Sequence, residues 1–125
     1  MDIYREILLD HYKNPRNFGH LDHPDAILEE GNVTCGDKIN MELKVRYEKI
    51  KIIEEIRFSG EGCAISQAAA SMLTEKVKGM STDDAMKLTS NDMTDMLGTS
   101  LTPSRMKCAV LSLEVLQKLI LSLKK

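Results

Sequence analysis

Three cysteines and one aspartate are the side chains of this sequence best suited to chemistry. Cys63 follows Cys35 by 28 positions and Cys108 follows Cys63 by 45, so there is no CxxC pair and no zinc-finger spacing. Any site that the cysteines share must therefore be assembled by the fold. An odd number of cysteines argues against a disulfide framework, which leaves metal binding, thiol chemistry or inert packing in the core.

Each cysteine is predicted at a boundary between segments, where a thiolate could be exposed. Cys35 lies in a Thr-Cys-Gly-Asp turn, Cys63 follows Gly62 at the start of a predicted helix, and Cys108 lies in the early turns of the last helix. The positive end of a helix dipole favours thiolate, the form that binds metal or attacks sulfur. A lone cysteine would be explained more simply as a core residue, but three at boundaries favour a shared site.

Asp37 is the candidate fourth member of that site. It stands two residues after Cys35, a spacing that points both side chains the same way on an extended chain, and Gly36 between them lets the backbone approach an ion. A carboxylate is a harder and weaker ligand for a soft centre than a thiolate, so this set is typical of a site that can release its cargo. The alternative for an aspartate beside glycine is an Asx-turn.

The elements that must position these residues follow from periodicity. Alternation of apolar and polar residues predicts two strands, over 39–47 and 50–58, that form an antiparallel hairpin turning near 47–50. A helix is predicted over 3–12, a loop over 14–24 and at most one weak strand within 25–34. Further helices are predicted over 64–78, from Ser81 through Leu88, over 91–97, and after Thr102 and Pro103 to the end.

Strands followed by helices predict one α+β domain spanning 1–125. We expect a small antiparallel sheet of about three strands, with helices packed on one face and a long C-terminal helix. A formal charge of −2, 4% aromatic residues and no tryptophan argue against nucleic acid as a partner. No segment approaches membrane-spanning length, and the N-terminal residues do not resemble a secretory signal, so the expected location is the cytoplasm, where thiols stay reduced.

Four segments make the sequence recognisable. It resembles the IscU/NifU-like iron-sulfur cluster assembly scaffolds over essentially its whole length. The resemblance is carried by DHYKNPRNFG at 10–19, CGD at 35–37, FSGEGCAISQAAASM at 58–72 and RMKCAVLSLEVL at 105–116. The three cysteines fall in register with those of the family.

The resemblance implies both a ligand set and a function. It implies that Cys35, Asp37, Cys63 and Cys108 bind a nascent [2Fe-2S] cluster, iron or zinc, and that Cys108 accepts sulfur as a persulfide. Such a scaffold is not an enzyme. It takes sulfur from a cysteine desulfurase and electrons from a donor such as a ferredoxin, and it transfers the cluster to apo iron-sulfur proteins. Whether the cluster form is a monomer or a homodimer is left open.

Two departures from the housekeeping scaffolds keep an alternative open. Lys107 stands where those proteins have histidine before the third cysteine, as in the SufU branch, whose members resemble zinc-dependent sulfur acceptors. That branch carries an additional stretch between the second and third cysteines, which the interval of 45 here lacks. LTPSR at 101–105 replaces the two-proline segment that a dedicated Hsp70 chaperone reads. The alternatives are therefore a zinc-dependent sulfurtransferase and, third, a structural zinc domain.

The histidines are weaker candidates for the site, although a loop histidine that reached it could complete a metal centre. His11, His20 and His23 all lie in the first 23 residues, so a Cys/His pair would require this segment to fold over the thiols. We interpret His11 as a helix-face residue and the other two as solvated loop residues. The glycines at 60 and 62 lack the Gly-Lys-Ser/Thr of a phosphate loop, so nucleotide binding has no support.

Overall fold

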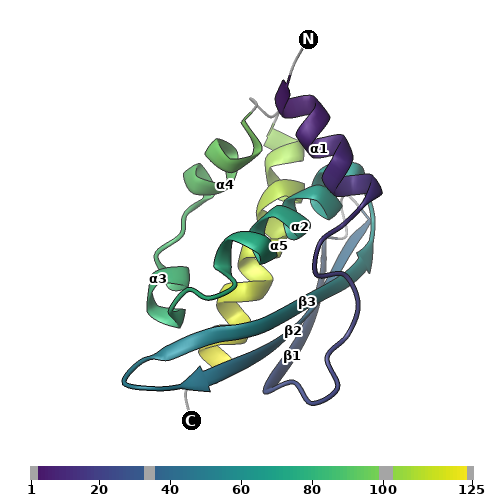
Figure 1. Cartoon of the computed structure of the whole chain (residues 1–125). Helices are drawn as coiled ribbons and strands as arrows, with labels where there is room; N and C mark the ends of the chain where they lie inside the picture. Colours follow the sequence, from purple (N-terminus) through teal and green to yellow (C-terminus); the bar gives the residue numbers. More distant parts are fainter. Residues whose placement is uncertain (1–2, 33–35, 99–102, 124–125) are drawn as a thin grey trace.

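A sheet and a layer of helices make up this protein (Figure 1). The computed structural model describes residues 3–32, 36–98 and 103–123, and within these ranges the sheet is three-stranded with the order β1-β2-β3. The elements along the chain are α1 (Ile3–Lys13), β1 (Ala26–Asn32), β2 (Asp37–Tyr47), β3 (Lys51–Glu61), α2 (Ala64–Val77), α3 (Thr82–Met86), α4 (Ser90–Leu97) and α5 (Pro103–Ser122).

The predicted hairpin of β2 and β3 is confirmed, and a bulge explains where its pattern breaks. Both strand pairs are antiparallel, with Leu43 opposite Ile56, but the register shifts after Lys44 so that Val45 pairs with Ile53. Glu54 is the extra residue of this bulge and is exposed, whereas Ile53 is fully buried. The bulge therefore changes which residues of β3 face the core, and this is why the apolar alternation is interrupted there.

The helices lie on one face of the sheet, as the sequence predicts. The C-terminal helix α5 packs on β1 and β2, and α2 packs on β3, while α1 packs on α2 (Figure 1). The core between the layers contains alternate residues of β2 with apolar residues of α2 and α5: Ile39, Met41, Leu43, Leu73, Val77, Leu116 and Leu119 are all fully buried. Within the described residues, no helix is long and apolar enough to cross a membrane.

Several predicted boundaries are shifted. The segment 25–34 holds a full seven-residue strand, β1, which pairs with β2 along its length. β3 continues past Phe58 to Glu61, since it still pairs with β2 after the alternation has ended. α3 ends at Met86 rather than Leu88, because Thr89 and Asp92 form a capping box that starts α4. Thr102, the expected cap of the last helix, lies outside the described residues.

Candidate metal centre

Three elements that are distant in sequence bring Asp37, Cys63 and Cys108 together. Asp37 is the first residue of β2, Cys63 is the N-cap of α2, and Cys108 lies in the second turn of α5. One ligand atom from each of the three lies within 4.8 Å of the others. The hairpin of β2 and β3 and the packing of α5 on the sheet position these residues. The structure thus joins three of the four residues expected at the site.

Asp37 is held against the start of α2 by both of its oxygens. Its Oδ1 accepts a hydrogen bond from the backbone N–H of Cys63 at 2.8 Å, and its Oδ2 lies 3.7 Å from the Cys63 Sγ. The side chain is only 2% exposed. A buried carboxylate requires hydrogen bonds or an opposite charge, so a cation at this position would complete its environment.

Gly62 allows this close approach. Its φ is +139°, and a Cβ at this position would lie 2.1 Å from the Asp37 Oδ1. Any side chain there would therefore displace the carboxylate or the backbone. This role of Gly62 was not predicted from the sequence. The available signal was its position directly before a candidate ligand.

The carbonyl of Cys63 is also held by hydrogen bonds, as its N–H is. Its carbonyl accepts hydrogen bonds from the N–H of Gln67 at 3.2 Å and from the Ser66 hydroxyl at 3.0 Å. The residue has φ −73° and ψ 161°, the extended conformation of an N-cap, while its own side chain makes no capping bond. The thiol faces the Asp37 Oδ2 instead, and the Cys63 backbone is held by hydrogen bonds at both its N–H and its carbonyl.

The donor set suits a soft metal ion or an iron-sulfur cluster. In a tetrahedral zinc site, a sulfur and an oxygen ligand are about 3.6 Å apart and two sulfurs about 3.8 Å apart. The 3.7 Å between Cys63 Sγ and Asp37 Oδ2 matches the first value. Since all three ligand atoms lie within 4.8 Å of one another, no pair of them needs to move closer by more than about 1 Å to bind zinc. Two thiols and one carboxylate are three ligands, which leaves room for a fourth.

Cys35, the expected fourth ligand, lies outside the described residues. Gly36, the residue between it and Asp37, has φ +71°, a turn conformation that glycine adopts without strain. The expectation that each thiol lies where it could be exposed is confirmed for Cys63 and is wrong for Cys108, which is 5% exposed. Cys108 is buried because its face of α5 packs on the rest of the fold, whereas Lys107 beside it is exposed.

Among the described residues, the group of ligands contains no histidine, and His11 and His20 take part in other contacts. His11 is buried where α1 meets α2, and its Nδ1 lies 2.8 Å from the Ser71 Oγ. Desolvation by burial holds the pKa of His11 below its ordinary value, with the Arg16 charge acting in the same direction. His23 is exposed in the loop, as expected.

His20 is exposed, as predicted, but it is not simply solvated. Its Nδ1 is paired with the buried Glu42, whose other oxygen accepts a bond from the Leu21 N–H at 2.8 Å. Burial raises the pKa of Glu42, but the hydrogen bonds from His20, Leu21 and Asn40 outweigh it, and the net pKa lies below the ordinary value. Glu42 of β2 therefore holds the loop before β1 against the sheet.

Comparison with known proteins identifies the family. The profile of the NifU-like N terminal domain matches residues 3–125. The iron-sulfur cluster assembly scaffold protein IscU of Aquifex aeolicus (strain VF5) is 42% identical, over 90% of this chain and 71% of its own length. The zinc-dependent sulfurtransferase SufU of Bacillus subtilis (strain 168) is 36% identical, over 93% of this chain and 88% of its own.

A solved structure has the same fold. The putative iron-sulfur cluster assembly scaffold protein for the SUF system from Fervidobacterium islandicum AW-1 superposes with a TM-score of 0.78 at 24% identity, covering 92% of this chain and 94% of the other. The profile match spans nearly the whole chain, and the curated relatives are similar over most of their length. This chain therefore belongs to the NifU-like N-terminal domain family of iron-sulfur cluster assembly proteins.

Proposed function

We propose that this protein is a scaffold on which a [2Fe-2S] cluster is built and from which it is transferred to apo-proteins. Cys35, Asp37, Cys63 and Cys108 are the proposed ligands, all within one domain spanning 1–125. The observation that carries the proposal is the convergence of Asp37, Cys63 and Cys108 within 4.8 Å. The cluster is the cargo of this site, so the protein acts as a carrier and not as an enzyme.

The sulfur would arrive as the persulfide of a cysteine desulfurase. The thiolate of Cys108 attacks the terminal sulfur, the donor's S–S bond breaks, and the donor cysteine leaves as thiolate while Cys108 becomes a persulfide. Each sulfane sulfur must then take up two electrons to become sulfide. For a cluster with two ferric ions, two ferrous ions supply one electron each, and a donor such as a ferredoxin supplies the other two.

Lys107 is suited to help this step. It is exposed and directly precedes the buried Cys108, the residue that would receive sulfur. A nearby cation favours thiolate over thiol and attracts an anionic persulfide. Since these thiols must be reduced to function, we place the protein in the cytoplasm.

A zinc-dependent sulfurtransferase is the second candidate. It is supported by the similarity to the SufU protein of Bacillus subtilis and by Lys107. In this function the same four side chains hold tetrahedral zinc, and Cys108 leaves the zinc to take the persulfide sulfur. The three donors in the structure are compatible with an iron-sulfur cluster and with zinc. The metal that the protein retains therefore distinguishes the two candidate functions.

The test is anaerobic reconstitution with ferrous iron, a cysteine desulfurase and cysteine, followed by visible absorption and circular dichroism. The scaffold function predicts a stoichiometric [2Fe-2S] spectrum that moves to an apo-ferredoxin. It also predicts loss of this spectrum in Cys35→Ser, Cys63→Ser and Cys108→Ser, with Ser59→Ala unchanged as the control. A colourless protein that keeps zinc and raises desulfurase turnover would replace the scaffold with the sulfurtransferase.

A further inference from the structure

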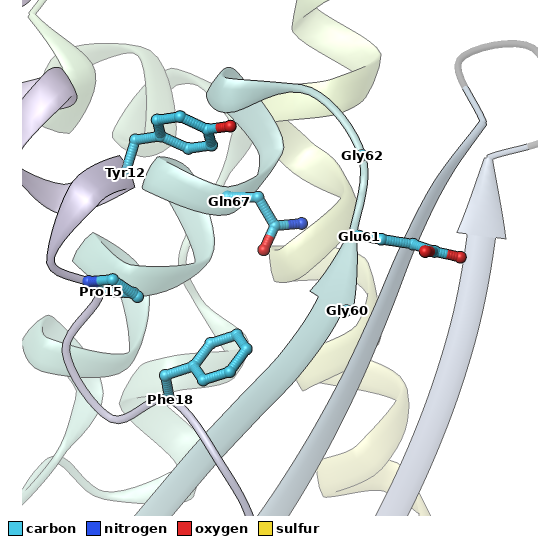
Figure 2. A pocket seen from close by; sticks show the side chains of 7 residues that line it. All are labelled: Tyr12, Pro15, Phe18, Gly60, Glu61, Gly62 and Gln67. Atoms are coloured by element: carbon cyan, nitrogen blue, oxygen red, sulfur yellow. The ribbon is translucent and has the colours of Figure 1, made fainter.

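A fully buried serine of α5 carries a hydroxyl that makes no hydrogen bond. Ser112 is 0% exposed, and its Oγ is one of two buried side-chain nitrogen or oxygen atoms without a partner in the part of the chain that the structure describes. The other atom belongs to Gln67, which lines a pocket together with Tyr12, Pro15 and Phe18 (Figure 2). A buried hydroxyl without a partner destabilises the folded protein, and native structures retain few of them. Ser112 therefore requires an explanation.

The backbone of its own helix does not satisfy this hydroxyl. Serine and threonine within a helix commonly donate to a carbonyl of the preceding turn. Thr74 of α2 donates to the Ser71 carbonyl at 2.9 Å. Thr94 of α4 donates to the Ser90 carbonyl at 3.0 Å. Among the described residues Ser112 has no such bond, so its proton is left for a neighbouring side chain.

Ser112 lies one helical turn after Cys108, on the same buried face of α5. Cys108, Ser112, Val115 and Leu119 follow one another at intervals of three or four residues, and none of them is more than 5% exposed. Cβ atoms four residues apart on a helix are about 5–6 Å from each other. Helical side chains lean toward the N-terminus, so the Ser112 side chain leans toward the turn that carries Cys108. The Ser112 Oγ and the Cys108 Sγ each stand one bond beyond Cβ, and rotation about χ1 can bring them into contact.

The Cys108 sulfur is a suitable acceptor in otherwise apolar surroundings. α5 packs on β2 and α2, whose contributions to the core include Ile39, Ala69 and Leu73. Such side chains offer no hydrogen-bond acceptor. A thiol is a weak acceptor, whereas a thiolate bound to a metal ion is a strong one because it carries negative charge. Metal binding by Cys108 would therefore provide the acceptor that the Ser112 hydroxyl lacks.

We propose that Ser112 is a positioning residue of the metal centre, whose hydroxyl donates a hydrogen bond to the Cys108 sulfur when that sulfur binds zinc, iron or an iron-sulfur cluster. This inference rests on the function proposed above, because the sulfur becomes a strong acceptor only as a ligand. Groups that donate hydrogen bonds to metal ligands orient those ligands and tune the metal. Ser112 acts from the buried side of the centre, where its own exposure is zero.

Ser112→Ala tests this bond because it removes only the hydroxyl, and we expect two effects of opposite direction. The metal-free variant should be at least as stable to denaturant as the unaltered protein, since a buried hydroxyl without a partner is lost and alanine favours the helix. Its affinity for zinc, measured by competition with a chromophoric chelator, should nevertheless be about tenfold lower. Ser112→Thr keeps the hydroxyl and should restore most of the affinity.

Ser122→Ala is the matched control. Ser122 is the last residue of α5, at the opposite end of the helix from Cys108, and its hydroxyl donates to the Leu119 carbonyl. The same exchange of serine for alanine in the same helix should leave the affinity for zinc equal to that of the unaltered protein.

The reduction potential of the reconstituted cluster is a readout that a packing role of Ser112 would not move. Reduction adds negative charge to the cluster and its ligating sulfurs, so a hydrogen bond to Cys108 stabilises the reduced form. Ser112→Ala should therefore shift the potential to a lower value. Ser112→Thr and Ser122→Ala should keep the potential of the unaltered protein.

The outcomes separate this inference from the proposed function. Equal zinc affinity and equal cluster potential in Ser112→Ala would overturn the inference and leave the function intact. A loss of affinity in Ser112→Thr as large as in Ser112→Ala would also overturn it, because the hydroxyl would not be the cause. If the unaltered protein neither builds a cluster nor accepts sulfur, the proposed function fails, and the zinc titration still decides the role of Ser112. Zinc affinity that Cys108→Ser leaves unchanged would overturn both the ligand role of Cys108 and the inference.

Discussion

At the scale of single residues, the centre depends on a glycine as much as on its ligands. Asp37 receives the Cys63 N–H and lies beside the thiol because Gly62 leaves space for it. Asp37 is thus a structural anchor of the turn into α2 in addition to its proposed role as the oxygen ligand. Substitutions here must separate these two roles.

Gly62→Ala should damage both the anchor and the centre. The new Cβ would lie 2.1 Å from the Asp37 Oδ1, at a φ of +139° that disfavours side chains. We expect a loss of about 1–3 kcal/mol in the free energy of unfolding and an affinity for zinc about tenfold lower. Denaturant unfolding and competitive zinc titration measure the two effects. Gly19→Ala is the control, since its φ is +129° but nothing lies within 4 Å.

Asp37→Ala should slow the release of the cluster to an apo-ferredoxin. The oxygen ligand is the weakest of the four proposed, and its exchange would open the iron to an incoming thiolate. The rate of cluster transfer is followed by circular dichroism, and Glu61→Ala serves as the control for loss of an exposed acidic residue nearby. Faster loss from Asp37→Ala would count against Asp37 as the exit ligand.

At the scale of the elements, α1 is attached to α2 through a buried histidine, His11. The Ser71 Oγ accepts the Arg16 N–H at 2.8 Å and also lies 2.8 Å from the Nδ1 of His11. One hydroxyl of α2 thus contacts both α1 and the segment that follows it. The attachment also positions the segment 14–18, whose Pro15 and Phe18 line a pocket together with Gln67 of α2 (Figure 2).

The attachment of α1 should weaken in acid. Because burial lowers the pKa of His11 in the folded state, the unfolded chain binds the proton more readily. The free energy of unfolding from this residue is therefore complete above the ordinary histidine pKa of about 6.5 and is lost as the pH falls through the lower folded value. Unfolding at a series of pH values should show a smaller decrease in His11→Gln than in the unaltered protein. His23→Gln, in the exposed loop, should follow the unaltered protein.

At the scale of the whole molecule, the centre brings together residues from three elements, β2, α2 and α5, which also pack on one another in the core. Its described members come from the start of β2, the start of α2 and the second turn of α5. The unfolded chain does not hold these donors together, so a bound metal ion favours the folded state of the entire domain. The site is thus a link between layers as well as a carrier of cargo.

Zinc should raise the stability of the whole domain. A ligand that binds only the folded state at about 100 times its dissociation constant adds about 2.7 kcal/mol to the free energy of unfolding. Thermal unfolding of the metal-free protein with and without zinc measures this gain, and a chelator should reverse it. Cys63→Ser and Cys108→Ser should unfold without a comparable zinc effect. An equal gain in these variants would place the stabilising zinc elsewhere.

Much of the fold could be predicted from local pattern. The alternation along β2 and β3, the start of α2 at Cys63 and the start of α3 at Ser81 depend on a few neighbouring residues, and the structure confirms them. The weak strand β1 was underestimated, because its pairing partner β2 decides that it is a strand. The bulge at Glu54 similarly depends on the register of two strands. Its only sign in the sequence is the interruption of the apolar alternation at Ile53 and Glu54.

The sequence by itself determined the candidate ligands, because cysteine, aspartate and glycine at segment boundaries form a chemical pattern that needs no coordinates. Only the tertiary structure decided that Asp37, Cys63 and Cys108 meet and that Cys108 is buried while Cys63 is exposed. The physical reason is range. Local spacing governs helices, turns and alternation, whereas the approach and burial of side chains dozens of positions apart depend on how the layers pack.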